Sequence, residues 1–193
     1  MSDDTLVGQW ARLPATKSGD GDEWYTPDEV LDAVLLVAYH VTGSMLIDLD
    51  PCGAPVEFDR VGAVHTIRRP LDGTTEPWPG RGLVWCNPPY SDVEPWMRRC
   101  EFAARSRPVI LHVPPRVETK AWWSHFWSTN RGCMVVVKGR IKYHDGQGEK
   151  RQTAKFPTVF LTWDERLAEE LALALGRKGF SAKALVPAMD LPF

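Results

Sequence analysis

Four consecutive residues, Asn87-Pro88-Pro89-Tyr90, combine chemical groups that suit the binding of a planar amine. They follow the apolar run Leu83-Val84-Trp85-Cys86, which is typical of a buried strand, and ligands of open α/β sheets bind beyond the carboxyl ends of strands. The two prolines remove two backbone donors, so that carbonyl groups and the amide oxygen of Asn87 can accept hydrogen bonds. Tyr90 adds a flat face for stacking. A proline-rich surface loop is the alternative, and the full order after an apolar strand favours amine binding.

A second set of polar groups, Asp48 and Asp50, lies at the end of the preceding predicted strand. Carboxylates two positions apart on a strand point to the same face, where they can bind an ammonium or ribose and favour a sulfonium. Asp50-Pro51 is also a common way to end a strand. The chain has no Gly-x-Gly-x-x-Gly loop, which argues against a dinucleotide cofactor. Its five histidines have no ligand spacing, so no metal is expected.

The segments around these groups alternate between helical and extended patterns. Thr26-Pro27-Asp28-Glu29 has the sequence of a capping box and predicts a helix over residues 27–40. A second such box, Ser91-Asp92-Val93-Glu94, predicts the next helix. Further helices are expected at 119–128 and 164–175, and strands at 45–49, 83–86, 108–113, 133–138 and 157–163. This alternation predicts an α/β fold with a mostly parallel sheet flanked by helices and an antiparallel late strand.

The length of 193 residues most simply corresponds to one domain. Residues 1–22 are polar and rich in Gly, Ser and Asp, which predicts a flexible N-terminal arm. The domain itself is expected over residues 23–176, followed by a C-terminal tail over 177–193. Residues 52–82 lack a regular pattern, and a loop of that length inside a compact domain is usually functional or a small insertion. Residues 139–156 form a basic segment that contains glycine.

The net charge of −2 is unevenly distributed. Residues 1–59 carry 12 acidic and 2 basic side chains, whereas residues 98–155 carry 13 basic and 4 acidic ones. This asymmetry fits a half that binds a cation and a half that faces a polyanion, although a solvated surface gives the same counts. The four cysteines form no Cys-x-x-Cys pair, which favours reduced, cytosolic thiols over disulfides or zinc. No run approaches the roughly 18 apolar residues of a membrane span, and a signal sequence is not evident.

Several motifs occur in the order typical of one enzyme family. They are Trp24-Tyr25-Thr26-Pro27, Asp48-Leu49-Asp50-Pro51-Cys52, Trp85-Cys86-Asn87-Pro88-Pro89-Tyr90-Ser91, Val113-Pro114-Pro115-Arg116, Gly139-Arg140-Ile141-Lys142 and Pro157-Thr158-Val159. With this set, residues 23–163 resemble the phage-type DNA N6-adenine methyltransferases. The resemblance implies a single Rossmann-like methyltransferase domain that uses S-adenosylmethionine, without a metal, to methylate adenine in DNA. It further implies a site-specific modification enzyme, encoded by a phage or prophage, that acts in the bacterial cytoplasm without a membrane or an obligatory protein partner.

The resemblance assigns roles to two groups of residues. The catalytic group is the turn itself, Asn87, Pro88, Pro89 and Tyr90. The cofactor group comprises Trp24, Tyr25, Thr26, Pro27, Asp48, Asp50 and Pro51. The wider superfamily usually has an acid after its second strand, and both Asp59 and Asp72 are candidates for it. Its usual glycine-rich loop after the first strand is reduced here to Cys52-Gly53-Ala54-Pro55.

The chemistry of adenine explains why the turn Asn87-Pro88-Pro89-Tyr90 suits methylation of its N6 amino group. N6 is a poor nucleophile because its lone pair is delocalised into the ring, and Asn87 with the Pro88 carbonyl can accept both N6 hydrogens. Tyr90 is expected to stack on the base after the base leaves the duplex. Segments 54–82 and 139–156 have room for DNA contacts. The candidate phosphate contacts are Arg116, Lys120, Arg140 and Lys142, of which the last two equally fit a solvated strand edge.

Other functions use a similar amine-binding turn. Methylation of cytosine N4 or of a protein glutamine amide is an alternative function. The basic half of the chain favours DNA over protein as the substrate, and Asn87 favours adenine over cytosine. A cytosine-C5 enzyme needs a catalytic cysteine, and Cys52 is disfavoured because it belongs to the earlier strand. A relative that binds DNA without turnover is a third alternative, against which the intact turn and both acids argue. Trp122, Trp123 and Trp127 fit a helix core better than a base-stacking surface.

Overall fold

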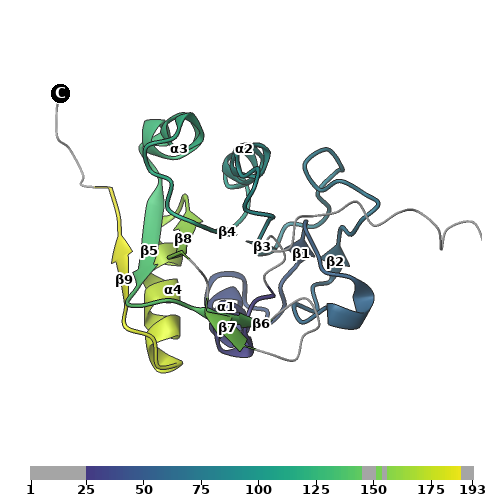
Figure 1. The fold of residues 1–193 in the computed structure, drawn as a ribbon, viewed down its shortest axis with the longest axis horizontal. Coiled ribbons are helices and arrows are strands. Elements are labelled where there is room, and N and C mark those ends of the chain that lie inside the picture. Colours follow the sequence, from purple (N-terminus) through teal and green to yellow (C-terminus); the bar gives the residue numbers. More distant parts are fainter. Residues whose placement is uncertain (1–24, 145–150, 154–155, 188–193) are drawn as a thin grey trace, which may run out of the picture.

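The computed structural model describes residues 25–144, 151–153 and 156–187, and the architecture concerns these residues. Seven strands form one sheet, two more form a hairpin, and helices cover both faces of the sheet (Figure 1). The helices are α1 (Asp28–Thr42), α2 (Glu94–Ala103), α3 (Lys120–His125) and α4 (Glu165–Arg177), with 3-10 turns η3 (Val56–Phe58) and η4 (Trp127–Thr129). The strands are β1 (Leu49–Asp50), β2 (His65–Thr66), β3 (Val84–Cys86), β4 (Val109–Val113), β5 (Cys133–Val137), β6 (Lys142–His144), β7 (Arg151–Thr153), β8 (Val159–Thr162) and β9 (Ala182–Leu185).

The strands of the large sheet follow the order β2-β1-β3-β4-β8-β5-β9. The first four run parallel to one another. β8 lies between β4 and β5 and is antiparallel to both, and β9 is antiparallel to β5. The predicted α/β fold of a single Rossmann-like domain is therefore confirmed. The prediction of a mostly parallel sheet is confirmed only in part, because three of the six pairings are antiparallel.

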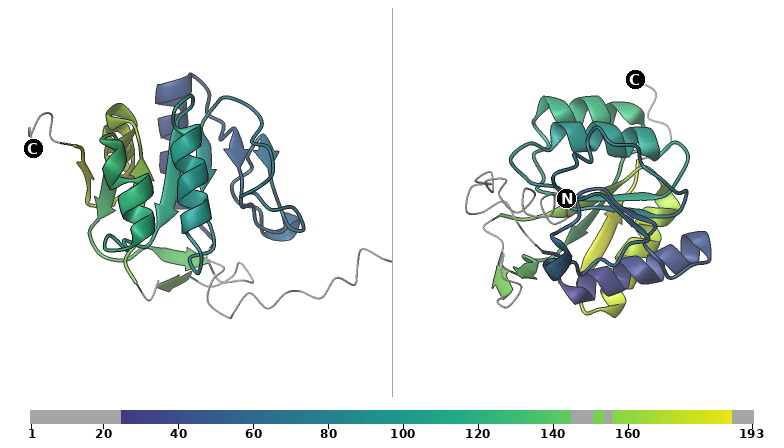
Figure 2. Two further views of the ribbon diagram at one scale, coloured as in Figure 1. Left: turned by 90° about the horizontal axis from the view of Figure 1, so that it is seen from above. Right: turned by 90° about the vertical axis from the view of Figure 1, so that its right-hand side faces the viewer.

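Two helices cover each face of the sheet. α1 and α4 pack together on one face, and α2 and α3 pack together on the other (Figures 1 and 2). In α1 the apolar residues recur at helical spacing, so that Val30, Val34 and Val37 are fully buried. The strands supply side chains to both layers, with Trp85 in one core and Leu111 in the other. Because both faces are covered, the central strands β3, β4 and β8 are buried along their whole length.

Both predicted capping boxes at the first two helices are wrong. Helix α1 has Pro27 at its N-cap position, and no side chain caps it. Helix α2 begins three residues after Ser91, also without a side-chain cap, and has Pro95 in its first turn. Proline fixes φ at a helical value, so each proline favours the start of its helix without help from a hydroxyl. The hydroxyl of Thr26, expected to cap α1, has a different partner, which is described with the site.

Several strands also differ from the predicted ones. β2, β6 and β7 form within segments 54–82 and 139–156, where no strand was predicted. The strand expected at 45–49 is confined to Leu49–Asp50, and Met45 and Leu46 are exposed. Residues 182–185, which the sequence analysis assigned to a tail, form the edge strand β9. Every second residue of β9 is exposed, so the segment lacks the apolar run that marks the central strands. Within the described ranges, no helix combines the length and apolarity that crossing a membrane requires.

The irregular segment 54–82 folds back against the first helix and the first strand. The guanidinium of Arg60 binds both carboxylate oxygens of Asp28, at 2.7 Å each. The backbone of Gly73 lies so close to the turn after β1 that a Cβ atom there would be 1.8 Å from the carbonyl oxygen of Pro51. The segment therefore packs directly beside the carboxyl end of β1.

Candidate active site

The carboxyl ends of β1 and β3 lie side by side at one edge of the sheet. The two strands are paired and parallel, as the sequence predicts. The turn after β1 also reaches the end of β3, because the sulfur atoms of Cys52 and Cys86 are 3.9 Å apart. All four cysteines of the chain are free thiols. This edge therefore brings together the strand ends that carry Asp50 and Asn87.

The side-chain amide of Asn87 is held at both of its polar atoms. Its Nδ2 donates a hydrogen bond to the Thr26 hydroxyl at 3.3 Å, and its Oδ1 accepts one from the Tyr90 hydroxyl at 2.9 Å. Thr26 is 5% exposed, so the contact lies inside the protein. Both partners are hydroxyl groups, and together they hold the two ends of the amide and fix its plane. The amide oxygen lies next to the Tyr90 hydroxyl.

Tyr90 is buried in this arrangement. Its side chain is 2% exposed, and its ring packs edge-on against Phe156 with ring centroids 5.6 Å apart. Pro88 is buried as well, and Pro89 is half-buried. A stacking role for Tyr90 therefore requires that its ring become accessible when a base binds.

Asp50 is a buried carboxyl group at the end of β1. It is 4% exposed, and its Oδ1 accepts a hydrogen bond from the backbone N of Cys52 at 3.1 Å. Burial raises the pKa of Asp50 to about 7, against the opposing effect of the Cys52 hydrogen bond. A neighbouring cation would favour the charged form of this group. The end of β1 is therefore suited to a positively charged part of a ligand.

Asp48, two residues earlier, is bound by the protein itself. Its Oδ2 accepts hydrogen bonds from the backbone N of Gly82 at 2.6 Å and from the Arg107 guanidinium at 2.7 Å. The Arg107 side chain is 5% exposed, so this ion pair is largely removed from solvent. The geometry favours Asp50 over Asp48 as the acid that faces a ligand.

The remaining residues of the predicted cofactor group flank α1 and β1. Tyr25 packs against Phe58 of segment 54–82, with ring centroids 5.7 Å apart. Pro27 and Pro51 are buried at the start of α1 and the end of β1. Trp24 lies outside the described residues.

The two candidates for the acid after the second strand differ in position and in partners. Asp59 precedes β2 and forms an ion pair with Arg68. Asp72 follows β2, is exposed, and accepts hydrogen bonds from the backbone N and the hydroxyl of Thr74 at 2.8 and 2.7 Å. Chain order and exposure therefore favour Asp72.

The four basic residues predicted to contact phosphates follow strands that end at the Asn87 edge. Arg116 comes after β4, and Lys120 begins α3. Arg140 and Lys142 come after β5, which runs in the same direction as β4 because both are antiparallel to β8. All four are exposed. Residues 145–150 and 154–155 of the basic segment 139–156 lie outside the described residues.

The sequence analysis missed a buried polar cluster formed by His112, Tyr143 and Thr158. The Tyr143 hydroxyl lies 3.0 Å from His112 Nε2 and 2.9 Å from the Thr158 hydroxyl. Burial lowers the pKa of His112 to about 3 and raises the pKa of Tyr143 to about 12, so both groups are uncharged at neutral pH. A lone histidine inside the apolar run 109–113 was the available signal, since a buried polar group requires partners. Its partners are too distant in sequence to be found from spacing.

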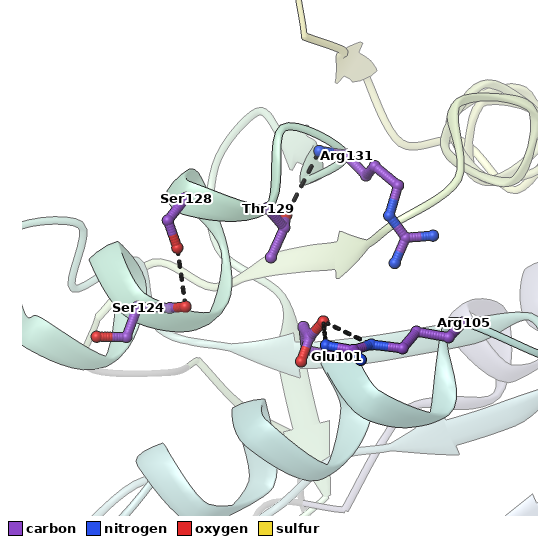
Figure 3. A pocket seen from close by; sticks show the side chains of 6 residues that line it. All are labelled: Glu101, Arg105, Ser124, Ser128, Thr129 and Arg131. Atoms are coloured by element: carbon purple, nitrogen blue, oxygen red, sulfur yellow. Dashed lines mark hydrogen bonds and ion pairs between the residues drawn. The ribbon is translucent and has the colours of Figure 1, made fainter.

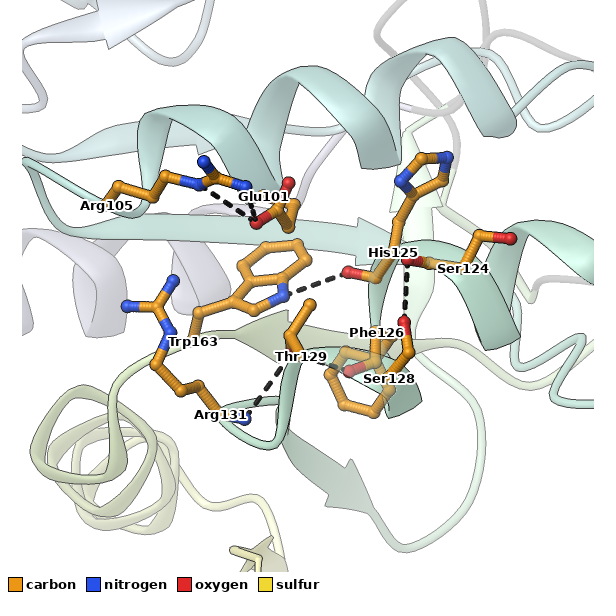
Figure 4. A network of polar contacts seen from close by, with 9 residues as sticks. All are labelled: Glu101, Arg105, Ser124, His125, Phe126, Ser128, Thr129, Arg131 and Trp163. Carbon is orange, nitrogen blue, oxygen red and sulfur yellow. Dashed lines mark hydrogen bonds and ion pairs between the residues drawn. The ribbon is translucent and has the colours of Figure 1, made fainter.

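A pocket of about 510 Å³ lies far from this edge, near the amino ends of β4 and β5 (Figure 3). Its lining consists of Glu101, Arg105, Ser124, Ser128, Thr129 and Arg131. The hydroxyls of Ser128 and Thr129 donate to backbone carbonyls, and Arg105 is paired with Glu101 (Figure 4). None of the predicted site residues lines this pocket. The hydrogen bonds of these polar groups are local, either within α2 and its end or within residues 124–131.

The neighbouring tryptophans divide between core and surface. Trp122 is buried, as predicted, whereas Trp123 is 62% exposed and Trp127 is half-exposed. Trp163 of the same region donates from its indole N to the backbone O of His125 at 3.1 Å (Figure 4). Across the described part of the chain, no group of three or more His, Cys, Asp or Glu side chains is arranged to hold a metal ion.

Comparison with known proteins identifies one family. Residues 14–178 match the family described as DNA N-6-adenine-methyltransferase (Dam), which is most of the chain and includes the Asn87 turn, both acids and the basic residues. No curated protein matches the chain.

Proposed function

The chain belongs to the DNA N-6-adenine-methyltransferase family, and on that premise we propose that it transfers a methyl group from S-adenosylmethionine to N6 of adenine at a specific DNA sequence. The observation that carries the proposal is the oriented amide of Asn87 at the carboxyl end of β3. The hydroxyls of Tyr90 and Thr26 hold its oxygen and its nitrogen, and the strand that ends in Asp50 lies beside it.

The chemistry proposed for this turn is hydrogen-bond acceptance from the target amine. Asn87 Oδ1 and the Pro88 carbonyl would accept the two hydrogens of N6, which become more acidic as the nitrogen becomes tetrahedral and positively charged. These bonds are therefore stronger in the transition state than in the ground state, and this difference is what accelerates the reaction. No strong general base is required, because the proton can leave N6 after the methyl group has been transferred.

Tyr90 is proposed to stack on the extruded adenine. Extrusion is necessary because N6 of a paired base cannot reach a protein site while it is inside the duplex. Since the Tyr90 ring is 2% exposed and packs on Phe156, base binding must separate these two rings.

The residues at the end of β1 fit S-adenosylmethionine. The cofactor would supply an activated methyl group on a positively charged sulfur. The buried carboxyl group of Asp50 is matched to a cationic ligand, because burial raises its pKa to about 7 and a neighbouring positive charge would favour its ionised form. Tyr25 offers a ring for stacking, and the exposed Asp72 offers acceptors for ribose hydroxyls. We propose that these three residues, with Pro27 and Pro51, bind the cofactor.

DNA is proposed to lie along the edge of the sheet that carries Asn87. Arg116, Lys120, Arg140 and Lys142 are exposed there and follow strands that end at this edge. Basic residues bind phosphates without reading sequence. Segments 54–82 and 139–156 are the proposed sources of sequence-specific contacts.

The test is incubation with radiolabelled S-adenosylmethionine and unmodified DNA, followed by nucleoside analysis of the product. We expect label in N6-methyl-2′-deoxyadenosine, saturation at a limited number of sites, and loss of labelling with Asn87→Ala. DNA already methylated on adenine is the matched substrate control. Label in N4-methylcytosine, or label only in added protein, would replace the proposal with the corresponding alternative substrate. Retained DNA binding without any label would identify an inactive relative.

A further inference from the structure

The loop of residues 72–78, called the Asp72 loop below, is built around its first residue. The Oδ1 atom of Asp72 accepts hydrogen bonds from the backbone N and the hydroxyl of Thr74, at 2.8 and 2.7 Å. Its backbone O accepts from the backbone N of Thr75 and of Glu76, at 3.0 and 2.9 Å. Within the described ranges, no group of the protein binds the other carboxylate oxygen, Oδ2. The loop therefore fixes Asp72 and leaves one acceptor oxygen for a ligand.

The Asp72 loop lies against the turn after β1 at Gly73. Gly73 is buried, and a Cβ atom on it would lie 1.8 Å from the carbonyl oxygen of Pro51 and 3.0 Å from the ring of Trp96 in α2. A side chain does not fit at such a distance from a backbone atom, so only glycine allows this approach. The chain neighbour of Asp72 thus contacts the chain neighbour of Asp50.

Arg99 of α2 holds the other end of the loop. Its Cζ atom lies over the ring of Trp78, 5.0 Å from the ring centroid, and its Nη2 donates to the backbone O of Glu76 at 2.5 Å. The indole N of Trp78 donates in turn to the backbone O of Gly73 at 2.8 Å. Arg99 is half-buried, and the attraction between a cation and an aromatic face increases as water is removed. One side chain therefore binds Glu76 and Trp78, and Trp78 binds Gly73.

Helix α2 directs one side of its surface to this loop. Trp96 and Arg99 are three residues apart, so they are neighbours on the helix surface. Both contact the Asp72 loop, Trp96 at Gly73 and Arg99 at Trp78. Arg98 is exposed. The sequence pair Arg98-Arg99 thus consists of one residue that binds the loop and one that faces solvent.

We propose that Arg99 is a positioning residue for the cofactor: it holds Glu76 and Trp78, keeps the Asp72 loop against Pro51, and so places Asp72 Oδ2 to accept hydrogen bonds from the ribose hydroxyls of S-adenosylmethionine. This inference rests on the proposed function and on the role proposed there for Asp72. Arg99 acts through the loop and not by contact with the cofactor. Helix α2 becomes part of the cofactor site, although no residue of α2 belongs to the predicted cofactor group.

The binding test is calorimetric titration of S-adenosylmethionine into Arg99→Met, Asp72→Asn and the double variant. Arg99→Met removes the guanidinium and should weaken binding by about 10-fold, the order of one lost hydrogen bond from a charged group. At saturating S-adenosylmethionine, kcat should change less than about 2-fold, because the loop binds the cofactor equally before and during methyl transfer. Since Arg99 acts through Asp72, the double variant should bind no more weakly than the weaker single variant. Arg98→Met, at the exposed neighbour, is the matched control.

Two results of the titration would overturn the proposal. One is an unchanged affinity in Arg99→Met, and the other is a double variant in which the two losses multiply. Either result leaves the proposed function intact if the unmodified protein binds S-adenosylmethionine and methylates adenine. If the unmodified protein does not bind S-adenosylmethionine, the proposed function fails and the cofactor role of Arg99 fails with it.

A second measurement requires no cofactor. The backbone amides of Thr74, Thr75 and Glu76 donate to Asp72, so their hydrogen exchange reports whether the loop stays closed around it. In Arg99→Met these amides should exchange about 10-fold faster, while those of β4 exchange at an unchanged rate. Faster exchange in β4 as well would assign Arg99 a general role in stability. Unchanged exchange in the loop would show that Arg99 does not hold it, and both results would overturn the proposal.

A milder variant keeps the test decisive if Arg99→Met does not fold. Trp78→Phe retains a ring below Arg99 and loses the N–H that binds Gly73. It should open the loop and weaken binding of S-adenosylmethionine in the same direction as Arg99→Met. Unchanged exchange and unchanged affinity in Trp78→Phe would overturn the proposal.

Discussion

The amide nitrogen of Asn87 donates a hydrogen bond to the hydroxyl of Thr26, a residue 61 positions earlier in the chain, at 3.3 Å. The segment before the first helix and the turn after β3 are thereby joined at one buried point. Thr26 was expected to cap α1 and to belong to the cofactor group. Its contact with Asn87 adds a second role, which is to hold the amide of that residue in place.

The first prediction follows from this contact. Thr26→Val keeps the shape of the side chain and removes the acceptor for Asn87 Nδ2, so we expect kcat to fall by about 10-fold. Thr26→Ser retains the acceptor and should keep most of the activity. Steady-state kinetics on duplex DNA measure both. Equal rates for the Val and Ser variants would show that the hydroxyl does not orient Asn87.

The second prediction concerns Asn87 itself. Asn87→Ala removes the proposed acceptor for N6 and should lower kcat by about 10²-fold or more, as the loss of an oriented transition-state contact does. Cofactor binding, measured by calorimetry, should stay close to that of the unmodified protein. A loss of cofactor affinity as large as the loss of turnover would instead place Asn87 in the cofactor site.

The third prediction uses the titration of Asp50. Burial raises the pKa of Asp50 to about 7, and a bound sulfonium or ammonium favours the ionised form. Binding of S-adenosylmethionine should therefore release a proton and tighten by about 10-fold between about pH 6 and pH 8. Asp50→Asn should weaken binding and abolish this dependence on pH. A dependence that persists in Asp50→Asn would assign the titration to a different group.

The fourth prediction concerns stability, where Asp50 and His112 act in opposite directions. Asp50 binds its proton more tightly in the folded state, so its contribution to stability is lost as pH rises from about 4 to 7. The pKa of His112 is lowered to about 3 by burial, so its contribution is lost as pH falls from about 6.5 towards 3. Between about pH 4 and 6.5, the loss of stability from Asp50 with rising pH and the gain from His112 offset each other.

Removing the Asp50 carboxyl group should reveal how the free energy of unfolding depends on pH through His112. In Asp50→Asn, the free energy of unfolding relative to the unmodified protein should increase with pH by up to about 1.4 kcal/mol per pH unit within that window. Urea denaturation at several pH values measures this difference. If the free energy of unfolding changed with pH in the same way for both proteins, the pKa of Asp50 would not be raised in the folded state.

The fifth prediction separates Asp48 from Asp50. The buried ion pair of Asp48 with Arg107 joins residues 59 positions apart at 2.7 Å. Arg107→Met leaves the carboxylate without its charged partner and should destabilise the fold by about 3 kcal/mol, while the pH dependence of cofactor binding remains. Thermal or urea unfolding, together with calorimetry at two pH values, gives both readouts. Loss of the pH dependence without loss of stability would reverse the roles given to the two acids.

The parts predictable from sequence are those encoded by short, contiguous patterns. The apolar run before Asn87 and the Asp50-Pro51 strand end gave the correct neighbouring strands, because burial of a strand is visible in its own residues. The predicted side-chain caps of the first two helices were wrong because a proline can begin a helix where a capping hydroxyl was expected. Strand β9 was not predicted because an edge strand needs apolar residues on one side only, so its sequence lacks a continuous apolar run.

The side-chain partners within the site were not predictable in the same way. Tyr143 and His112 are 31 positions apart, and Asn87 and Thr26 are 61 positions apart. Nothing in the local sequence indicates which buried hydroxyl meets which nitrogen, because such contacts depend on strand order. In this sheet β8 enters between β4 and β5, and that order brings Thr158 to Tyr143.

The same strand order has a consequence for the segment that is proposed to contact DNA. β5 ends and β8 begins as paired neighbours, with Val136 opposite Val159, so the chain leaves the sheet and returns to it at almost the same point. A segment whose ends meet in this way can be exchanged for another of different length at little cost in loop-closure entropy. Ile141 and Tyr143 are the buried residues that an exchange must preserve. Chimaeras that replace residues 145–155 keep Phe156 against Tyr90 and should therefore fold with the Asn87 turn unchanged. If this segment contacts DNA as proposed, such exchanges would allow related enzymes to acquire new target sequences by recombination at this single junction.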